Sequence, residues 1–335
     1  MPASLVSVII PAHNAARTLD QTLASARAQS YQSLEIIVVD DGSTDATAER
    51  VLDHAARDPR VRLIRQANAG VASARNRAMA DATGDYIAPL DADDLWHPEK
   101  IERQLRALQN AGDRAALAYG WFRRIDMADR VIAGSPCPRI EGRVLHRHLD
   151  WNFISNGSTP LVHASVARAV GFDPVLHQAG NQGCEDYLFQ LRIARDHGFV
   201  CVPAYLTGYR IADGAMSGNS ARMMRSHVQA LDLMRPVVGP AARRLIDRRR
   251  AAYARPLARM ALRQGRWGDA AAMVGLLLRA GPGALLRPRN RPVPTASTTD
   301  RPFDDWDAVA DDGAWQTARS EAWMAHLAQL DAALP

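Results

Sequence analysis

The chain has 335 residues, of which 47% are hydrophobic and 23% are charged, and its formal net charge is +5. This length and composition predict one large globular domain or two ordinary ones. They exclude a disordered chain, a collagen-like repeat and a disulfide-stapled miniprotein. Three scattered cysteines, Cys137, Cys184 and Cys201, fit small buried thiols in a reducing compartment and have no metal-binding spacing.

The positive charge is unevenly distributed along the chain. Residues 1–215 carry 23 basic and 25 acidic side chains, residues 216–300 carry 16 and 4, and residues 301–335 carry 2 and 7. The sequence therefore predicts a balanced body, a basic stretch and a short acidic tail.

Neither a signal peptide nor a membrane span is predicted. No basic region precedes the apolar run at residues 5–10, and no small-residue cleavage site follows it. The longest apolar window, residues 270–278, is about half of the roughly 20 residues that a span needs. We therefore expect a cytoplasmic protein that is soluble or peripheral at the inner face of the cell membrane.

The first hundred residues alternate strand-like and helix-like patterns. Apolar, β-branched runs predict four strands, at residues 5–10, 34–39, 61–64 and 85–90. Helical periodicity predicts three helices between them, at residues 15–29, 43–55 and 70–82. This order predicts an α/β fold with a mostly parallel sheet covered by helices on both faces.

Beyond residue 115 the pattern loosens into an α+β extension. It predicts strands at residues 115–125, 158–163 and 199–210 and a helix at 184–197. From residue 220 the chain is helical, up to a Pro- and Arg-rich linker at 281–302. A last helical segment contains Trp306, Trp315 and Trp323.

Polar and acidic residues follow three of the predicted strands. The first strand ends in PAHN at 11–14, the second in DDGS at 40–43 and the fourth in DADD at 91–94. Ligands of open α/β sheets bind at the carboxyl ends of the strands, so acidic side chains gather where a ligand is expected. The turn after the first strand has no glycine, which disfavours a dinucleotide site or a P-loop.

Asp91 and Asp93 form an Asp-x-Asp motif that suits a hard divalent cation. Mg²⁺ and Mn²⁺ prefer oxygen ligands and take one or two carboxylates, with waters and substrate phosphates completing the sphere. The alternative is a solvated acidic loop that caps the helix predicted at residues 98–109.

Four segments, in this order, resemble the family-2 nucleotide-sugar glycosyltransferases: VSVIIPAHNAARTL, EIIVVDDGSTDAT, NAGVASARNRAM and GDYIAPLDADD. The resemblance continues more loosely to Ser217. It implies a GT-A fold with a Rossmann-like sheet. It also implies inverting transfer of a sugar from a nucleoside diphosphate sugar, with uridine diphosphate as the expected nucleotide. The acceptor would be a glycan or a lipid-linked glycan in polysaccharide or cell-surface glycan synthesis.

The resemblance also implies a domain organisation. The GT-A domain would occupy residues 1–217, divided into a nucleotide-sugar half at 1–115 and an acceptor half at 116–217. A basic helical extension (218–280), the Pro/Arg linker (281–302) and an acidic helical tail (303–335) would follow.

Site residues are implied by matching motif positions. The nucleotide would contact Pro11, His13, Asn14, Asp40, Asp41, Arg75 and Asp91. Asp93, with Asp91, would bind Mn²⁺ or Mg²⁺. Asp186 would be the catalytic base and Glu185 would support the acceptor or the loop. The residues alone leave simpler alternatives: Arg75 as a solvated helix arginine, Asn14 as an N-cap and Glu185–Asp186 as an acidic helix start.

One segment departs from the family pattern. Ala212 stands where a histidine commonly completes the metal site, which predicts a weaker cation site or recruitment of Asp213 or water. Arg210 would face the diphosphate or form a surface salt bridge. Trp121, Trp151 and Phe153 would stack on acceptor sugars, with hydrogen bonds from residues 156–158, although aromatic side chains are more often core residues.

Nine arginines interleaved with apolar residues occupy residues 243–266. Such a helix can lie on an anionic bilayer, or it can simply pack with a solvated basic face. No nucleic-acid-binding module accompanies the charge, so no nucleic-acid partner is expected. Two functional classes follow: a glycosyltransferase, or a non-catalytic descendant of that fold that binds nucleotide-sugar or glycan.

Overall fold

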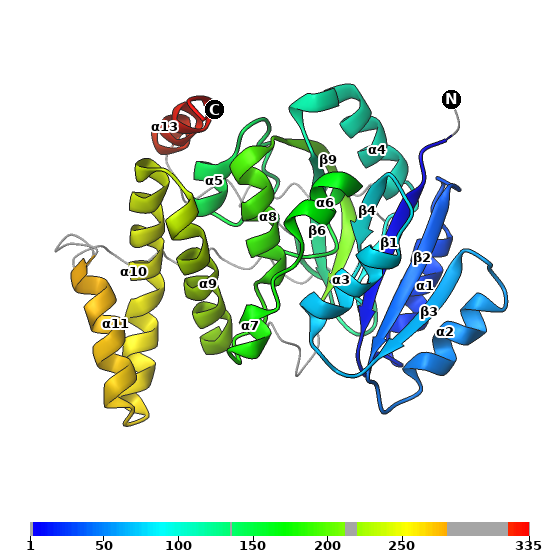
Figure 1. Cartoon of the computed structure of the whole chain (residues 1–335), viewed down its shortest axis with the longest axis horizontal. Coiled ribbons are helices and arrows are strands. Elements are labelled where there is room, and N and C mark those ends of the chain that lie inside the picture. Colours follow the sequence, from blue (N-terminus) through cyan, green and yellow to red (C-terminus); the bar gives the residue numbers. More distant parts are fainter. Residues whose placement is uncertain (1–2, 135, 212–219, 280–320, 335) are drawn as a thin grey trace.

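A computed structural model describes residues 3–134, 136–211, 220–279 and 321–334, which form a nine-stranded mixed sheet flanked by helices (Figure 1). The spatial strand order is β3-β2-β1-β4-β8-β6-β9-β5, and β7 pairs with β6. Strands β1 to β4 are parallel, β6 and β9 are parallel, and β8 is antiparallel to both β4 and β6. The strands are β1 Val6–Ala12, β2 Leu34–Asp41, β3 Val61–Gln66, β4 Tyr86–Pro89, β5 Leu95–Trp96, β6 Leu117–Ile125, β7 Val131–Gly134, β8 Leu161–His163 and β9 Phe199–Arg210.

Two hydrophobic cores cover the two faces of the parallel strands. Val8 and Ile10 of β1 pack in the core that contains Leu19 and Leu23, whereas Ile9 belongs to the core on the other face. Burial on both faces explains the continuous apolar runs of these strands. The helices are α1 Leu19–Arg27, α2 Thr47–Ala55, α3 Val71–Asp81, α4 Lys100–Ala111, α5 Leu145–Asp150, α6 Ala164–Val170, α7 Val175–Gln178, α8 Glu185–Asp196, α9 Ser220–Met234, α10 Pro240–Arg263, α11 Trp267–Arg279 and α13 Glu321–Ala332.

The predicted βαβαβαβ order and the α/β fold class are confirmed. The predicted strand at 199–210 is one continuous strand, β9. Two boundaries were wrong because loops occupy them: α1 begins at Leu19 rather than at residue 15, and β8 begins at Leu161 rather than at residue 158. Cys184 and Cys201 are buried as predicted, but Cys137 is exposed.

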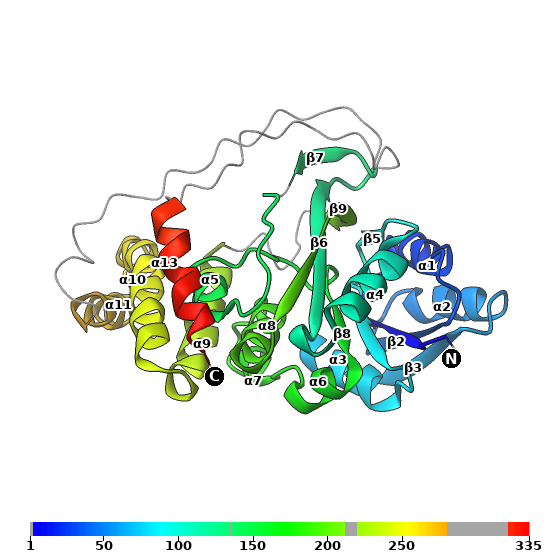
Figure 2. The ribbon, with the colours of Figure 1, turned by 90° about the horizontal axis from the view of Figure 1, so that it is seen from above.

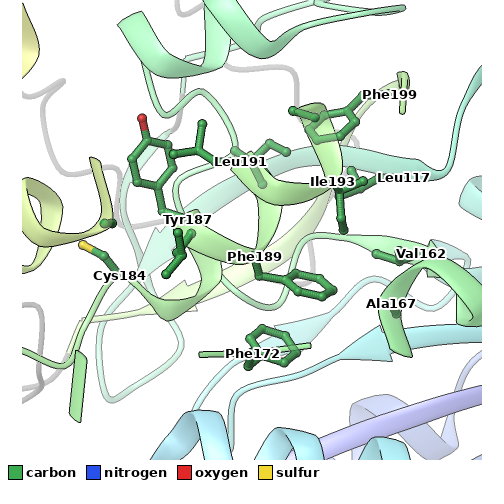
Figure 3. Packing of buried hydrophobic residues seen from close by; sticks show 14 of the residues in the cluster. Leu117, Val162, Ala167, Phe172, Cys184, Tyr187, Phe189, Leu191, Ile193 and Phe199 are labelled. Atoms are coloured by element: carbon green, nitrogen blue, oxygen red, sulfur yellow. The ribbon is translucent and has the colours of Figure 1, made fainter. Parts of the chain in front are cut away.

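Helix α8 is anchored in the larger core. The ring of Phe189 stacks on that of Phe172, with centroids 4.1 Å apart and planes 16° apart, and Leu191 and Ile193 extend the same buried cluster (Figure 3). This packing fixes the first turn of α8, where the sequence predicts the catalytic base.

The C-terminal helices pack beside α5 and α8, and α13 lies next to α5 (Figure 2). Asp331 of α13 is buried, and its carboxylate accepts hydrogen bonds from the backbone N–H of His146 (2.6 Å) and from Nε of Arg147 (2.6 Å). Nδ1 of His146 lies 3.0 Å from the same carboxylate. The last helix is therefore bonded to α5 across a sequence separation of 185 residues.

Several predicted features lie outside the described residues, namely the linker at 281–302, Trp306, Trp315, Ala212 and Asp213. Among the helices that are described, none is both long enough and apolar enough to cross a bilayer.

Candidate active site

Asp41 ties the end of β2 to the loop after β3. Its Oδ1 accepts hydrogen bonds from the N–H of Ala69 (2.8 Å) and the side-chain amide of Gln66 (2.7 Å), and Oδ2 accepts one from the N–H of Gly70 (2.9 Å). Gly70 has φ +87°, and a Cβ there would lie 2.6 Å from the ring of His177, so the loop requires glycine. Asp41 thus shapes the loop beside the predicted nucleotide position, and its contact with a base stays a prediction.

Asp40 is buried one residue earlier and closes the turn after β2. Its Oδ1 accepts a hydrogen bond from the N–H of Ser43 (2.9 Å), and its Oδ2 lies 3.5 Å from Nε of Arg65. The two neighbouring carboxylates therefore organise different loops at the same strand end.

His13 and Asn14 are exposed at the end of β1, whereas Pro11 is buried within the strand. Nδ1 of His13 lies 2.9 Å from the carbonyl oxygen of Asp41. Asn14 has φ 51°, and its Oδ1 accepts a hydrogen bond from the N–H of Thr44 (2.8 Å), so it bridges two strand ends rather than capping α1. Of these three residues, His13 and Asn14 present side chains at the surface.

The acidic loop after β4 holds three carboxyl groups in different environments. Asp94 is fully buried, and it accepts hydrogen bonds from the N–H of Arg210 (2.9 Å) and from the hydroxyl of Ser158. Burial, and then the charge of Asp91, raise the pKa of Asp93 to about 6. Burial, with the charges of Asp93 and Asp91, raises the pKa of Asp94 well above its usual range. Three carboxyl groups therefore lie together at this strand end, and their charges raise the pKa values of Asp93 and Asp94 further.

Arg75 of α3 is buried beside this loop. Its Nη2 donates to Oδ1 of Asp91, and its guanidinium carbon lies 5.0 Å from the ring centre of Phe172. A Cβ on Gly157 would lie 2.6 Å from Nη2, so the acceptor-half loop approaches as closely as a glycine permits. The solvated-helix alternative for Arg75 is wrong, because its side chain is enclosed by a ring, a carboxylate and a backbone segment.

Glu185 and Asp186 begin α8 with distinct partners. Both carboxylate oxygens of buried Glu185 accept hydrogen bonds from the N–H of Gly183 (3.0 and 2.8 Å), so Glu185 shapes the turn. Burial raises the pKa of Asp186 to about 7; the charge of Arg75 opposes this rise and that of Asp91 adds to it. A carboxyl group with this pKa can exchange protons near neutral pH.

Arg75 connects the two halves of the candidate site electrostatically. Burial lowers the pKa of its guanidinium, and the charges of Asp91, Asp186 and Glu185 together raise it above its usual value. The charges of the predicted metal ligand Asp91 and of the predicted base Asp186 therefore act on one buried cation, the predicted nucleotide residue Arg75.

Arg210, at the end of β9, is buried and bonds to several separate segments of the chain. Its guanidinium donates to the carbonyl oxygens of Asp93 (2.7 Å) and Asp126 (2.7 Å) and to Oε1 of Gln21 (3.1 Å), and it lies 2.6 Å from Asp129. Because it is buried among these partners, Arg210 holds the acidic loop in place and is not a surface salt bridge, and its contact with a diphosphate stays a prediction.

Trp121 and Trp151 are both half-buried. The indole N–H of Trp121 donates to the carbonyl oxygen of Pro138 (3.1 Å), and the ring of Trp151 contacts Phe153 edge-on at 6.2 Å. Phe153 itself is buried in the core. Stacking of an acceptor sugar on either tryptophan stays a prediction.

The donor set fits a divalent cation bound partly by substrate. Within the described ranges, no group of three or more His, Cys, Asp or Glu side chains has the arrangement of a complete protein metal site. Asp93 and Asp91 nevertheless supply carboxylate oxygens whose mutual repulsion a cation would relieve. Mg²⁺ and Mn²⁺ use such sites when phosphates and waters fill the other positions.

Two structural partners of the site were missed by sequence reasoning. Asp94 was assigned only to the start of a helix, because a carboxyl group after an apolar strand looks the same in sequence whether it is solvated or buried. Phe172, which supports Arg75, lies in an irregular segment without periodicity, and no local pattern marks it.

The parallel strands with acidic ends and the protonatable carboxyl group at the start of α8 agree with the GT-A glycosyltransferase fold that the sequence motifs resemble. The family model for glycosyl transferase family 2 matches residues 7–157. The amylovoran biosynthesis glycosyltransferase AmsB of Erwinia amylovora is 30% identical over 241 residues, which are 69% of this chain and 77% of AmsB. The chain belongs to glycosyl transferase family 2.

Other relatives differ in length. The UDP-Glc:alpha-D-GlcNAc-diphosphoundecaprenol beta-1,3-glucosyltransferase WfgD of Escherichia coli is 28% identical over 66% of this chain and 83% of its own. Chondroitin synthase of Escherichia coli is 43% identical over 129 residues, which are only 19% of its length.

Solved structures share the fold. The match to S. aureus TarS 1-349 in complex with UDP-GlcNAc has a TM-score of 0.54 at 13% identity, over 80% of this chain and 90% of TarS 1-349. The match to the mannosyltransferase PcManGT from Pyrobaculum calidifontis, in complex with GDP-Man and Mn2+, has a TM-score of 0.56 at 20% identity, over 84% of this chain and 77% of PcManGT. Both matches place the chain in the GT-A fold.

Proposed function

We propose that the protein is an inverting, metal-dependent hexosyltransferase that moves a sugar from a uridine diphosphate sugar to a lipid-linked glycan acceptor. One observation carries the proposal: the buried guanidinium of Arg75 donates a hydrogen bond to Asp91 of the nucleotide half, and the charge of Asp186 of the acceptor half raises the pKa of the same guanidinium. This arrangement brings a predicted donor group and a predicted base into one site.

Asp186 acts as the base. Its carboxylate accepts the proton of the acceptor hydroxyl as that oxygen forms a bond to the anomeric carbon, and the bond from that carbon to the diphosphate oxygen breaks with its electrons leaving on the nucleoside diphosphate. One base suffices, because attack from the face opposite the leaving group inverts the anomeric centre in a single step. The raised pKa of Asp186 strengthens it as a base near neutral pH.

The remaining residues bind and orient. His13, Asn14 and the loop anchored by Asp40 and Asp41 receive the nucleoside, and Arg75 keeps Asp91 in place. Asp93, with Asp91, would hold Mn²⁺ or Mg²⁺, which supplies neutralising charge for the diphosphate leaving group. Glu185 holds the turn before α8, and Trp121 and Trp151 border the acceptor side.

The choice of substrates draws on the relatives. TarS binds UDP-GlcNAc and the printed name of WfgD gives a diphosphoundecaprenol-linked acceptor, whereas PcManGT binds GDP-Man with Mn2+. A lipid-linked acceptor places the reaction at the inner face of the cell membrane, with residues 1–217 as the catalytic domain and the basic helices at 218–280 as an extension.

Release of UDP tests the proposal against the non-catalytic alternative. Purified protein is incubated with UDP-glucose or UDP-GlcNAc, Mn²⁺ and a polyprenyl diphosphate-linked GlcNAc acceptor, beside the Asp186→Asn variant. We expect acceptor-dependent UDP release from the wild type alone. Binding of UDP without release from any donor and acceptor pair would favour a nucleotide-sugar-binding descendant.

The metal requirement is tested by thermal shift. UDP should stabilise the wild type more with Mn²⁺ or Mg²⁺ than with a chelator, and the Asp93→Asn variant should lose that difference. An equal shift with and without metal would exclude the role of Asp93 as a ligand.

A further inference from the structure

Exposed apolar side chains gather on the hairpin of α10 and α11. The described part of the chain exposes seven large hydrophobic side chains, and four of them lie between residues 262 and 278. The other three, Leu52, Met127 and Val237, are scattered over unrelated elements. The four are Leu262 (44% exposed), Trp267 (71%), Val274 (42%) and Leu278 (63%).

Helix α11 has two apolar stripes, and the described part of the chain covers only one of them. Leu277 packs with Ala251 and Ala254 of α10, and Met273 joins this small cluster. Trp267, Ala271, Val274 and Leu278 recur at intervals of four, three and four residues, so they share a second face. That face is exposed along the whole helix, and a helix apolar on more than its packed side needs a further apolar partner.

Positive charge surrounds the exposed stripe at the elbow between the two helices. Arg259, Arg263 and Arg266 are all exposed there, and Gly265, with φ +70°, makes the turn. Arg266 also lies 3.0 Å from Asp269 at the start of α11. Aromatic, aliphatic and basic side chains therefore occupy one end of the hairpin.

The structure divides the basic stretch predicted at 243–266 into arginines that contact other residues of the protein and arginines beside the exposed apolar stripe. In the first half of α10, Arg250 pairs with Asp232 (2.5 Å) and Asp247 (3.2 Å), and Arg248 lies over the ring of Trp323 at 4.8 Å. These arginines make intramolecular contacts. The arginines beyond Pro256 are the ones beside the exposed apolar stripe.

We propose that the α10–α11 elbow, residues 259–278, docks on an anionic bilayer. Trp267 and Leu278 enter the interface between lipid headgroups and acyl chains, where tryptophan is enriched, and the three elbow arginines contact lipid phosphates. Charge complementarity selects this partner over a second copy of the chain, because self-association would bring two clusters of arginine together.

The elbow and helix α7 lie in the same part of the view in Figure 1. In Figure 1, α10 descends to the elbow at the lower edge of the view, and α7 also lies in the lower part. His177 of α7 lies against Gly70, whose N–H binds Asp41. Delivery of a lipid-linked acceptor to the site rests on the proposed function, whereas docking itself does not.

Vesicle co-sedimentation of the full chain tests the proposal. Binding is compared on phosphatidylcholine vesicles and on vesicles that also contain phosphatidylglycerol, for the wild type, Trp267→Ser/Leu278→Ser and Arg263→Gln/Arg266→Gln. The matched controls are Leu52→Ser and Arg57→Gln, an exposed leucine and an exposed arginine near α2. Size-exclusion chromatography with light scattering gives the mass of each variant, and UDP release gives its activity on soluble substrates.

We expect the wild type to bind only the anionic vesicles. The serine variant should lose about tenfold or more in partition coefficient, and the glutamine variant about tenfold or more. Both controls should bind as the wild type does, and all variants should release UDP equally. Equal binding by the elbow variants and the controls would overturn the proposal, as would a wild-type dimer that Trp267→Ser/Leu278→Ser converts to a monomer. Vesicle binding without any UDP release would contradict the enzymatic function alone.

Discussion

The two edges of the sheet are built from sequence in different ways. In the β3-β2-β1-β4 edge, the strands come from one continuous run of βα units. β1 pairs with β2 and β2 with β3, the next strand along the chain, and β4 alone crosses back to pair with β1. In the β8-β6-β9-β5 edge, Leu95 pairs with Gly208, and β8 lies between β4 and β6 although about forty residues separate it from β6. A repeated local unit therefore builds most of the first edge, whereas long-range packing determines the second.

The candidate site lies where these two edges meet. Asp91 and Arg75 come from the locally determined edge, and Asp186, Ser158 and Arg210 come from the other. Chemistry that needs both sets can occur only when the second edge closes on the first. Variants that affect one set at a time therefore measure how much each region contributes to activity, nucleotide binding and stability.

Asp186→Asn should have the largest effect. The amide keeps the size of the side chain and its contact with the N–H of Tyr187 but cannot accept the proton, so kcat should fall by about a thousandfold. The dissociation constant of UDP, measured by calorimetry, should change by less than about threefold, because no nucleotide loop is altered.

Glu185→Gln is the neighbouring control for this variant. It retains one oxygen toward the N–H of Gly183 and should keep most of the activity. If Glu185→Gln loses as much kcat as Asp186→Asn, the assignment of the base to Asp186 is wrong.

Asp331→Ala should have the next largest effect, on stability. It leaves the N–H of His146 and the guanidinium of Arg147 without their buried acceptor, which should destabilise the fold by about 3 kcal/mol. Chemical denaturation followed by tryptophan fluorescence measures the change. The affinity for UDP should be unchanged, since α13 contacts the acceptor half.

Glu321→Ala controls for the helix itself. Glu321 is an exposed acidic residue of the same helix, so its loss should leave stability within about 0.5 kcal/mol of the wild type. Equal destabilisation by the two variants would mean that the buried contact of Asp331 is not what holds α13.

The strand ends of the nucleotide half were predictable because each polar residue directly follows the apolar run that forms its strand. Apolar runs predict the positions of β1, β2 and β4, and because ligands bind at the carboxyl ends of such strands, the acidic residues that follow them are expected at the ligand edge. The family resemblance supplies the roles predicted for them. The loop contacts of Asp41 were beyond this reasoning, because they depend on the left-handed turn at Gly70.

The buried polar contacts of the acceptor half could not be predicted from the sequence, for a physical reason. Arg210 is adjacent in space to Asp93, Asp126 and Gln21, which are distant in sequence, and no periodic pattern encodes such a buried ion network. The contact of Asp331 with α5 is of the same kind. A lone charged residue looks alike in sequence whether it is solvated or buried with a partner.

Asp41→Asn should weaken nucleotide binding by about tenfold. One oxygen becomes an amide that faces a backbone N–H of Ala69 or Gly70, so the loop loses a charge-assisted hydrogen bond. Calorimetric titration with UDP measures the loss, and Asp53→Asn, which changes an exposed acid of α2, should leave the affinity unaltered. An unchanged affinity in Asp41→Asn would show that the loop does not depend on this anchor.

The smallest expected effect, a shift in the pH profile of kcat, most directly tests the electrostatic interaction between the two regions. Because Asp186 must be ionised to accept a proton and its pKa is about 7, kcat should rise about tenfold per pH unit below pH 7 and level off above it. The charge of Arg75 lowers this pKa and that of Asp91 raises it. At saturating donor, Arg75→Gln should therefore move the midpoint of the pH profile upward, and Asp91→Asn should move it downward. Opposite displacements would come only from charges that reach Asp186 across the boundary between the halves. Shifts in the same direction, or none, would mean that the group titrating in the profile is not Asp186.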